Sequence, residues 1–198
     1  MNTSQVKADT LIGAALAPVD WTRAVSLVFA FSLLTALAAQ ISIPIGPVPI
    51  TGQTFAVLLT GALLGSRLGA ITMILYLIEG ASGLPFFYHG AGGIGHLLGP
   101  TGGYLVAFPA AAFITGAFAE HGWDKRFFTA VVAMAIGSAL ILFAGWAWLA
   151  QLMSATAAFH AGFNVFILTG DVIKILLAAA VLPSGWALLR RKASQEKS

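Results

Sequence analysis

The sequence predicts an all-α integral membrane protein, folded as a bundle of six transmembrane helices with both termini in the cytoplasm. Three observations predict it: an apolar composition, six apolar runs and a one-sided distribution of cations. The chain has 198 residues, of which 59% are hydrophobic and 9% charged, and its mean hydropathy is +0.91. A soluble globule of this size needs more polar surface than that, so lipid is the predicted solvent.

The apolar runs and the cations between them set the predicted topology. The runs are residues 27–40, 54–64, 68–78, 104–119, 127–149 and 163–189. If the runs cross the membrane in alternating directions, starting from a cytoplasmic N-terminus, most cations fall on the cytoplasmic side. They are Lys7, Arg23, Arg67, Lys125, Arg126, Arg190, Arg191, Lys192 and Lys197. Because positively charged short connections are retained in the cytoplasm, both termini are predicted there. The remaining cation, Lys174, lies inside the last run.

The first apolar run is preceded by a segment that needs separate treatment. Residues 1–22 are predicted to form a cytoplasmic tail or an interfacial helix, because Asp9, Pro18 and Asp20 interrupt an apolar stretch too short to span a membrane. A signal peptide is the alternative, since Lys7 precedes that stretch. Residues 23–190 are then one membrane domain, and residues 191–198 are a basic tail at the cytoplasmic membrane edge.

The second and third runs are predicted to be two short helices that turn at Gly65, Ser66 and Arg67. A single helix over 54–78 would leave five spans and move the C-terminal cations outside, against the charge rule. Eleven or twelve residues reach only about 18 Å, whereas the hydrocarbon core is about 30 Å thick. Irregular backbone must complete such a crossing, and it is tolerated where protein covers it or water fills a cavity.

The outer connections on either side of this hairpin are unusual. Residues 43–51 hold three prolines among branched apolar residues, which predicts extended backbone and excludes helix. Residues 80–103 are rich in glycine and aromatic residues and contain no Lys, Arg, Asp or Glu. This composition favours a loop packed on the protein that admits a ligand close to its backbone. A compact surface loop or a re-entrant loop remains the alternative.

The last run contains the sharpest chemical feature of the chain. Asp171 and Lys174 lie three residues apart, so they share one helical face and can pair. Ionisable groups within a membrane span are costly, which makes a functional site the first hypothesis. A self-neutralising pair that holds helices together is the alternative. Glu79, at the outer end of the third run, is a third charge that either binds a ligand or ends a helix.

Several functional classes find no support in the sequence. The chain has no cysteine, and its four histidines are not clustered at metal-ligand spacing, so no metal site is predicted. The cations do not form a basic face interleaved with aromatics, which argues against nucleic-acid binding. No phosphate-binding Gly-x-x-x-x-Gly-Lys loop is present, so nucleotide hydrolysis would have to come from another protein.

Five motifs follow one another along the chain. They are Ile-Pro-Ile-Gly-Pro-Val-Pro-Ile-Thr-Gly-Gln-Thr-Phe-Ala-Val at 43–57, Leu-Leu-Gly-Ser-Arg-Leu-Gly-Ala at 63–70, Gly-Leu-Pro-Phe at 83–86, Leu-Gly-Pro-Thr-Gly-Gly-Tyr at 98–104 and Gly-Asp-Val-Ile-Lys at 170–174. In this order they resemble the motifs of the BioY family, the biotin-specific substrate-binding (S) components of energy-coupling factor (ECF) transporters. The resemblance runs from the first helix to the last, over roughly residues 24–190. It implies six helices and a biotin site near the outer face, covered by the loops that follow the first and third helices.

The resemblance also implies a set of biotin-binding residues. Asp171 would accept a ureido N–H, and Lys174 would donate to the ureido oxygen. The apolar wall would come from Phe55, Leu84, Pro85, Phe86 and Tyr104, close backbone approach from Gly92, Gly93 and Gly103, and further polar contacts from Gln53 and Thr51. Family members commonly carry an apolar or amide residue near the position of Glu79, so its carboxylate would either accept a second ureido N–H or be protonated.

The resemblance further implies partners and a location. A transmembrane T component and a pair of cytoplasmic ATPases would supply energy, and the location would be the cytoplasmic membrane of a prokaryote. Small side chains on the first helix offer a face for packing against a partner helix: Ser32, Thr35, Ala36 and Ala39. Packing within the chain is the alternative, since it uses the same residue types. No cofactor is expected. An intramembrane enzyme and a proton-coupled permease are the alternatives, but the chain has no known catalytic motif and no internal repeat.

Overall fold

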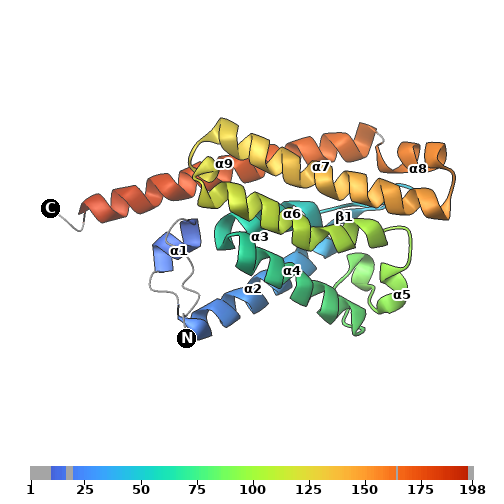
Figure 1. Cartoon of the computed structure of the whole chain (residues 1–198), viewed down its shortest axis with the longest axis horizontal. Helices are drawn as coiled ribbons and strands as arrows, with labels where there is room; N and C mark the ends of the chain where they lie inside the picture. The colour runs from blue at the N-terminus through green and yellow to red at the C-terminus, as the bar shows by residue number, and fades with distance from the viewer. Residues whose placement is uncertain (1–9, 17–19, 164, 196–198) are drawn as a thin grey trace.

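The computed structural model describes residues 10–16, 20–163 and 165–195, and most of them are helical (Figure 1). The elements are α1 (Leu11–Leu16), α2 (Trp21–Gln40), β1 (Ser42–Ile43), β2 (Ile50–Thr51), α3 (Gln53–Leu64), α4 (Ser66–Ala81), η1 (Tyr88–Gly90), α5 (Ile94–Leu97), α6 (Gly102–Glu120), η2 (Trp123–Lys125), α7 (Phe127–Leu152), α8 (Ala155–Gly162) and α9 (Val165–Gln195). The predicted helical class is confirmed, with one small hairpin added. The predicted tails lie partly outside the described residues, and α9 continues through 191–195 as helix.

The long helices lie side by side along the long axis of the molecule (Figure 1). Helix α6 is central, because it packs against α3, α4 and α7, while α9 packs on α7 and α2 packs on α4. Tyr76, Met73, Met134 and Ile141 are almost fully buried in the core between them. The core therefore runs through the middle of the bundle.

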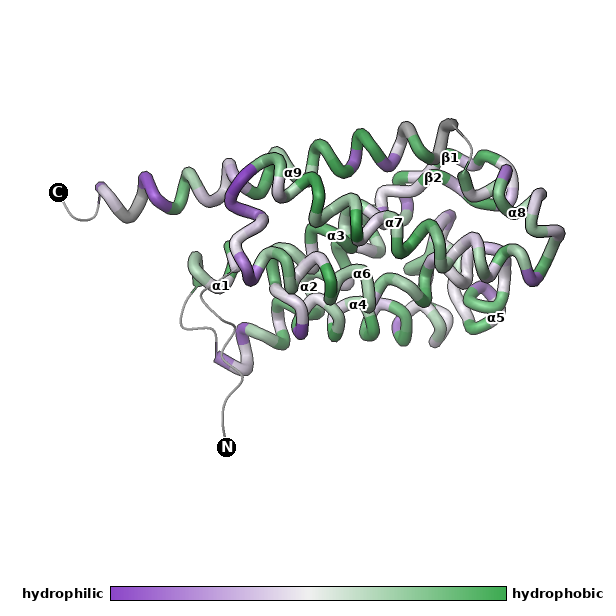
Figure 2. Tube along the Cα trace, turned by 45° about the horizontal axis from the view of Figure 1, so that its top comes forward, coloured by the Kyte–Doolittle hydropathy of each residue, from purple (hydrophilic) through white to green (hydrophobic). Residues whose placement is uncertain are grey.

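Within the described residues, four segments are long and apolar enough to cross a membrane: α2, α6, α7 and residues Gly170–Arg191 of α9. Helix α3 is apolar but has only 12 residues, about 18 Å of rise. Figure 2 shows apolar residues along the helices and hydrophilic segments gathered near α1 and the end of α9. Large apolar side chains such as Phe29, Leu37, Phe143 and Leu177 are more than half exposed, which suits a surface solvated by lipid. The chain is thus a multi-pass membrane protein.

The chain turns between α3 and α4 at Gly65, so the predicted pair of helices is found. Gly65 has a φ of +86°, a conformation that favours glycine. The backbone N–H and the hydroxyl of Ser66 both donate to Glu120 Oε1, at 2.8 and 2.9 Å. This contact lets α4 begin at Ser66, and at its other end the helix continues past Glu79 to Ala81. Helix α4 is therefore longer than the apolar run 68–78 predicted.

Replacing Glu120 by Ala is expected to lower the free energy of unfolding by about 1–2 kcal/mol, because the first turn of α4 loses the acceptor for its N–H. Thermal unfolding of the protein in detergent measures this change. Glu120→Gln is the matched control, since its amide oxygen can still accept from Ser66. Equal melting temperatures for both variants and the unchanged protein would contradict the capping role.

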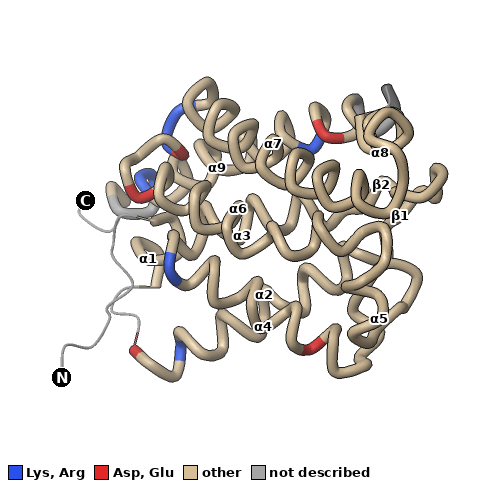
Figure 3. Tube along the Cα trace, turned by 45° about the vertical axis from the view of Figure 1, so that its right-hand side comes forward, with Lys and Arg blue, Asp and Glu red and all other residues tan. Residues whose placement is uncertain are grey.

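Cations gather at one end of the bundle, which we call the cation-rich end (Figure 3). It holds the connections α3–α4 and α6–α7, the start of α2 and the last turns of α9. Here Trp186 Nε1 donates to Asp124 Oδ2 at 2.6 Å, and the ammonium of Lys125 lies 4.7 Å from the centre of the Trp186 ring. Burial raises the pKa of Asp124 above its usual value. These contacts fix the α6–α7 connection on α9.

The small side chains of α2 that were predicted to face a partner helix are buried within the chain. The exposed fractions of Ser32, Thr35 and Ala39 are 0% and that of Ala36 is 5%. Helix α2 packs against α3 and α4, so this stripe serves packing inside the bundle. The prediction of a partner-facing stripe at these residues is wrong, because close approach between helices of the same chain uses the same residue types.

The opposite end, which we call the loop end, comprises β1, β2, residues 82–101 and α8. Strands β1 and β2 pair antiparallel, with Ser42 opposite Thr51, as the proline-rich sequence predicts for extended backbone. Gln40 Nε2 donates to the carbonyl of Phe87 at 3.1 Å, and Gln40 Oε1 accepts from the N–H of Gly90 at 2.9 Å. The side chain of Phe87 is fully buried. The glycine-rich connection is therefore packed on the protein, as predicted.

Candidate ligand-binding site

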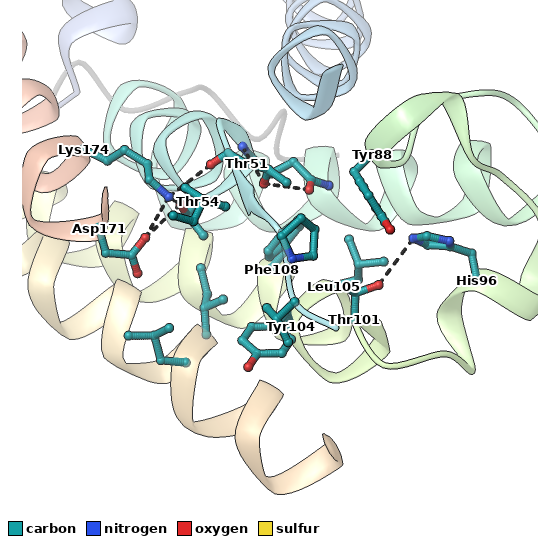
Figure 4. A pocket seen from close by; sticks show the side chains of 16 residues that line it. Thr51, Thr54, Tyr88, His96, Thr101, Tyr104, Leu105, Phe108, Asp171 and Lys174 are labelled. Atoms are coloured by element: carbon teal, nitrogen blue, oxygen red, sulfur yellow. Dashed lines mark hydrogen bonds and ion pairs between the residues drawn. The ribbon is translucent and has the colours of Figure 1, made fainter. Parts of the chain in front are cut away.

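A pocket lies at the loop end, between the hairpin, the connection 82–101 and helices α3, α6, α7 and α9 (Figure 4). Its volume is about 60 Å³. It is lined by Val48, Pro49, Ile50, Thr51, Gln53, Thr54, Tyr88, His96, Thr101, Tyr104, Leu105, Phe108, Ile141, Leu142, Asp171 and Lys174. The lining combines an apolar middle with polar groups on two sides.

The first polar side is built around the Lys174 ammonium. It lies 2.8 Å from Asp171 Oδ1, 2.7 Å from Thr54 Oγ1 and 3.0 Å from the carbonyl oxygen of Thr51. An ammonium has three N–H donors, and these acceptors use all of them. The lysine of α9 is therefore held by α3 and by the end of β2 as well as by its own helix.

The carboxylate of Asp171 completes this network. Its Oδ2 accepts from the hydroxyl of Ser138 on α7 at 2.8 Å, and Thr54 Oγ1 lies 3.4 Å from its Oδ1. Asp171 is 5% exposed. A carboxylate offers about four lone-pair sites, so one remains for a further donor. In the Asp171–Lys174 pair the carboxylate is thus buried and the ammonium partly buried, and the pair is electrically neutral overall and close to saturated with hydrogen bonds.

Gln53 is held by its neighbours. Its Nε2 donates to Tyr76 Oη at 2.7 Å, and its Oε1 accepts from the hydroxyl of Thr51 at 2.9 Å. The Tyr76 hydroxyl donates in turn to the carbonyl oxygen of Phe86 at 2.9 Å. This series of hydrogen bonds connects α3 and α4 to the glycine-rich connection, and it fixes the side-chain amide of Gln53 at the edge of the pocket.

The second polar side lies across Phe108 from the charged pair (Figure 4). His96 Nε2 is 3.3 Å from Thr101 Oγ1, and the imidazole stacks on the Phe87 ring with 5.1 Å between ring centres. The Tyr88 ring centre is 5.6 Å from that of His96. Partial burial lowers the pKa of His96 below its usual value. Three hydrogen-bonding side chains therefore converge here.

The middle of the pocket is apolar. Phe108, Leu105 and Tyr104 of α6 face Ile141 and Leu142 of α7, and the hairpin adds Val48, Pro49 and Ile50. Tyr104 Oη has no hydrogen-bond partner among the described residues. Apolar walls with a few fixed polar groups are typical of small-molecule sites.

The structure brings Asp171, Lys174, Gln53, Tyr104 and Thr51 together, and the sequence had proposed all five as ligand contacts. The other proposed residues are not among the lining residues: Glu79, Phe55, Leu84, Pro85, Phe86, Gly92, Gly93 and Gly103. The carboxylate of Glu79 accepts a hydrogen bond from Ser32 on α2. A Cβ on Gly103 would meet the Trp148 side chain of α7, and one on Gly92 would meet the backbone of Leu84. These glycines therefore allow close packing within the protein.

Several lining residues were missed by the sequence reasoning. Leu105 and Phe108 follow Tyr104 by one and four residues, so helical spacing from Tyr104 would have found Phe108. Thr54 was part of a quoted motif but was given no role. The contact of Ser138 with Asp171 depends on the packing of α7 against α9, and the sequence carries no signal for it.

The fold and the pocket together define a multi-pass helical membrane protein with a pocket between its helices. The chain belongs to the BioY family, which matches residues 3–191. It is 43% identical to the probable biotin transporter BioY of Pyrococcus horikoshii over 80% of this chain and 93% of that one. It is 37% identical to the biotin transporter BioY of Thermotoga maritima over 76% and 88% of the two chains.

A solved structure shares the architecture. The crystal structure of the S-component for biotin from an ECF-type ABC transporter superposes with a TM-score of 0.74 at 25% sequence identity. The match covers 82% of this chain and 90% of the other. The two proteins therefore share the arrangement of helices described above.

Proposed function

We propose that this protein is the biotin-capturing S component of an ECF-type transporter and has no enzymatic activity of its own. The observation that carries the proposal is the buried Asp171–Lys174 pair beside an apolar pocket, in a chain of the BioY family whose relatives are named biotin transporters. A ureido group has N–H donors and a carbonyl acceptor, which is the complement of a carboxylate and an ammonium.

The ureido head of biotin binds at the charged pair in this proposal. One ureido N–H donates to the lone-pair site that Asp171 keeps free. Lys174 exchanges its contact with the carbonyl oxygen of Thr51 for the ureido oxygen, while Thr54 and Asp171 continue to hold the ammonium. The bicyclic ring then lies against Phe108 and Tyr104. A neutral head matches a neutral pair, so no buried charge is left without a partner.

The loops over the site must move when the ligand enters. A volume of about 60 Å³ holds a few water molecules and is too small for biotin. The hairpin and the connection 82–101 cover the pocket, and Gly46, Gly83, Gly90 and Gly93 give them positive φ at points where the backbone turns. These connections act as the cover of the site, and they open toward the side from which biotin arrives.

Six helices, α2, α3, α4, α6, α7 and α9, cross the membrane in this proposal, and the cation-rich end faces the cytoplasm. Positively charged connections are retained on that side, so both termini are cytoplasmic and the pocket opens outward. Helices α3 and α4 are short, and the covered hairpin and the connection 82–101 complete their crossing. The host membrane is the cytoplasmic membrane of a prokaryote.

Purified protein in detergent is expected to bind biotin with 1:1 stoichiometry, as measured by isothermal titration calorimetry. Desthiobiotin keeps the ureido group and the carboxylate, so it is expected to bind as well, with lower affinity because it lacks the sulfur ring that packs in the apolar middle. A neutral vitamin without a ureido group serves as the negative control. Absence of heat with biotin, from protein that elutes as a single species, would refute the proposed function.

Energy for uptake comes from partners, namely a transmembrane T component and a pair of cytoplasmic ATPases. Membranes that contain the chain together with these partners are expected to hydrolyse ATP faster when biotin is added outside. A proton-coupled permease needs no nucleotide, so biotin uptake by the chain alone, driven by a pH gradient, would favour that alternative.

A further inference from the structure

The neutral head and the anionic tail of the proposed ligand need different surroundings in the pocket. This inference rests on the proposed function. Among the described lining residues, formal charge comes from Asp171 and Lys174, which neutralise each other at 2.8 Å. Biotin carries a neutral ureido head and an anionic carboxylate tail. The site must therefore take up one negative charge more than its charged pair can balance.

The charged pair is a poor place for that carboxylate. All three N–H donors of Lys174 have partners, and one of these partners is the carboxylate of Asp171. A ligand carboxylate there would bring a second anion next to Asp171, which is 5% exposed. Two carboxylates that share one ammonium leave an uncompensated charge in a buried place, and this is strongly unfavourable.

The second polar side has the properties that the pair lacks. Tyr88, His96 and Thr101 offer two hydroxyl groups and an imidazole, no carboxylate is among the lining residues on that side of Phe108, and all three side chains are only partly buried. The His96 ring is held in place by stacking on Phe87, whose buried ring in turn packs on Gly80. Donors that are fixed and partly hydrated can bind an anion without removing it fully from water.

We propose that Tyr88, His96 and Thr101 form the subsite for the carboxylate of the ligand and make the protein selective for the anionic form of the tail. The imidazole N–H and the two hydroxyl groups donate to the carboxylate oxygens. The ligand then lies across Phe108, with its neutral head at Asp171 and Lys174 and its tail beside the connection 82–101. The connection 82–101, which covers the site, thus also selects ligands by the charge of their tail.

The test compares biotin with biotinamide, in which a neutral carboxamide replaces the carboxylate, by calorimetry on the full chain. The unchanged protein is expected to bind biotin at least about tenfold more tightly than biotinamide, because hydrogen bonds to a charged acceptor are the stronger ones. His96→Leu is expected to remove most of this preference by weakening biotin alone. His96→Gln, which keeps an N–H donor, is expected to retain part of it. Ile94→Ala, on the same short helix with a largely exposed side chain, is the matched control.

The outcomes separate this subsite from the function on which it rests. Unchanged binding of biotinamide shows that a variant is folded, and Thr101→Val tests the subsite independently if His96→Leu does not fold. Equal loss of both ligands, or of neither, in His96→Leu and Thr101→Val would overturn the subsite and leave biotin binding in place. Loss of the preference in Lys174→Met instead would place the carboxylate at the charged pair. Binding of neither ligand by the unchanged protein would overturn the proposed function and the subsite together.

Discussion

Asp171→Asn and Lys174→Met are each expected to weaken biotin binding by about 3–5 kcal/mol, because each removes a charged group that hydrogen-bonds the ureido head and leaves the other charge without its partner. In Asp171→Asn, the amide oxygen can still accept from Lys174, but the negative charge that balanced the ammonium is gone. In Lys174→Met, the carboxylate of Asp171 keeps only hydroxyl donors, from Ser138 and Thr54. Isothermal titration with biotin measures the loss, which corresponds to a factor of about 150 or more in Kd.

The double variant Asp171→Asn/Lys174→Met distinguishes a ligand site from a pair that only holds helices together. It removes both charges, so thermal stability is expected to recover relative to either single variant. Binding is not expected to recover, because the ammonium that donates to the ureido oxygen is gone and an amide has replaced the carboxylate that accepts the ureido N–H. Val172→Ala, on the exposed side of the same helix, should bind normally. Normal binding by the double variant would show that the pair has no role in ligand recognition.

The parts of this site that depend on charge and local backbone were predictable from the sequence. Asp171 and Lys174 stood out because two ionisable residues in an apolar run need a partner or a function. The hairpin at 43–51 was predicted as extended backbone because three prolines exclude helix. The turn at Gly65 followed from the distribution of Lys and Arg. In each case the information lies within a few residues or in the alternation of charge along the chain.

The parts that depend on contacts between distant segments were not predictable. The bond from Ser138 to Asp171 joins α7 to α9 across 33 positions of the sequence. Glu79 was proposed as a ligand contact, yet it pairs with Ser32 on a helix 47 positions away. Gly92 and Gly103 were assigned to close approach of the ligand, and the structure uses them for close approach of neighbouring protein atoms. A glycine in the sequence indicates that something lies close to it, and only the fold shows what that is.

Gly61 of α3 is the clearest example of a glycine that allows close approach between helices. A Cβ at Gly61 would lie 2.3 Å from the carbonyl oxygen of Ala112 in α6, and a Cβ at Gly69 of α4 would lie 2.9 Å from the Cα of Gly61. Three helices therefore meet at one point with backbone against backbone. No side chain there can rotate away to make room.

Gly61→Ala is expected to lower the free energy of unfolding by about 3 kcal/mol, near the upper end of the cost of overpacking a core, because the atom in the way belongs to the backbone of the central helix. Gly95→Ala is the matched control: no atom lies within 4 Å of the added Cβ, and its φ is not positive. Thermal unfolding and size-exclusion chromatography in detergent report the difference. Because α6 also carries Tyr104, Leu105 and Phe108, a shift of this helix should weaken biotin binding as well. Equal melting temperatures for the two variants would mean that α3 and α6 are farther apart in the membrane than in the structure.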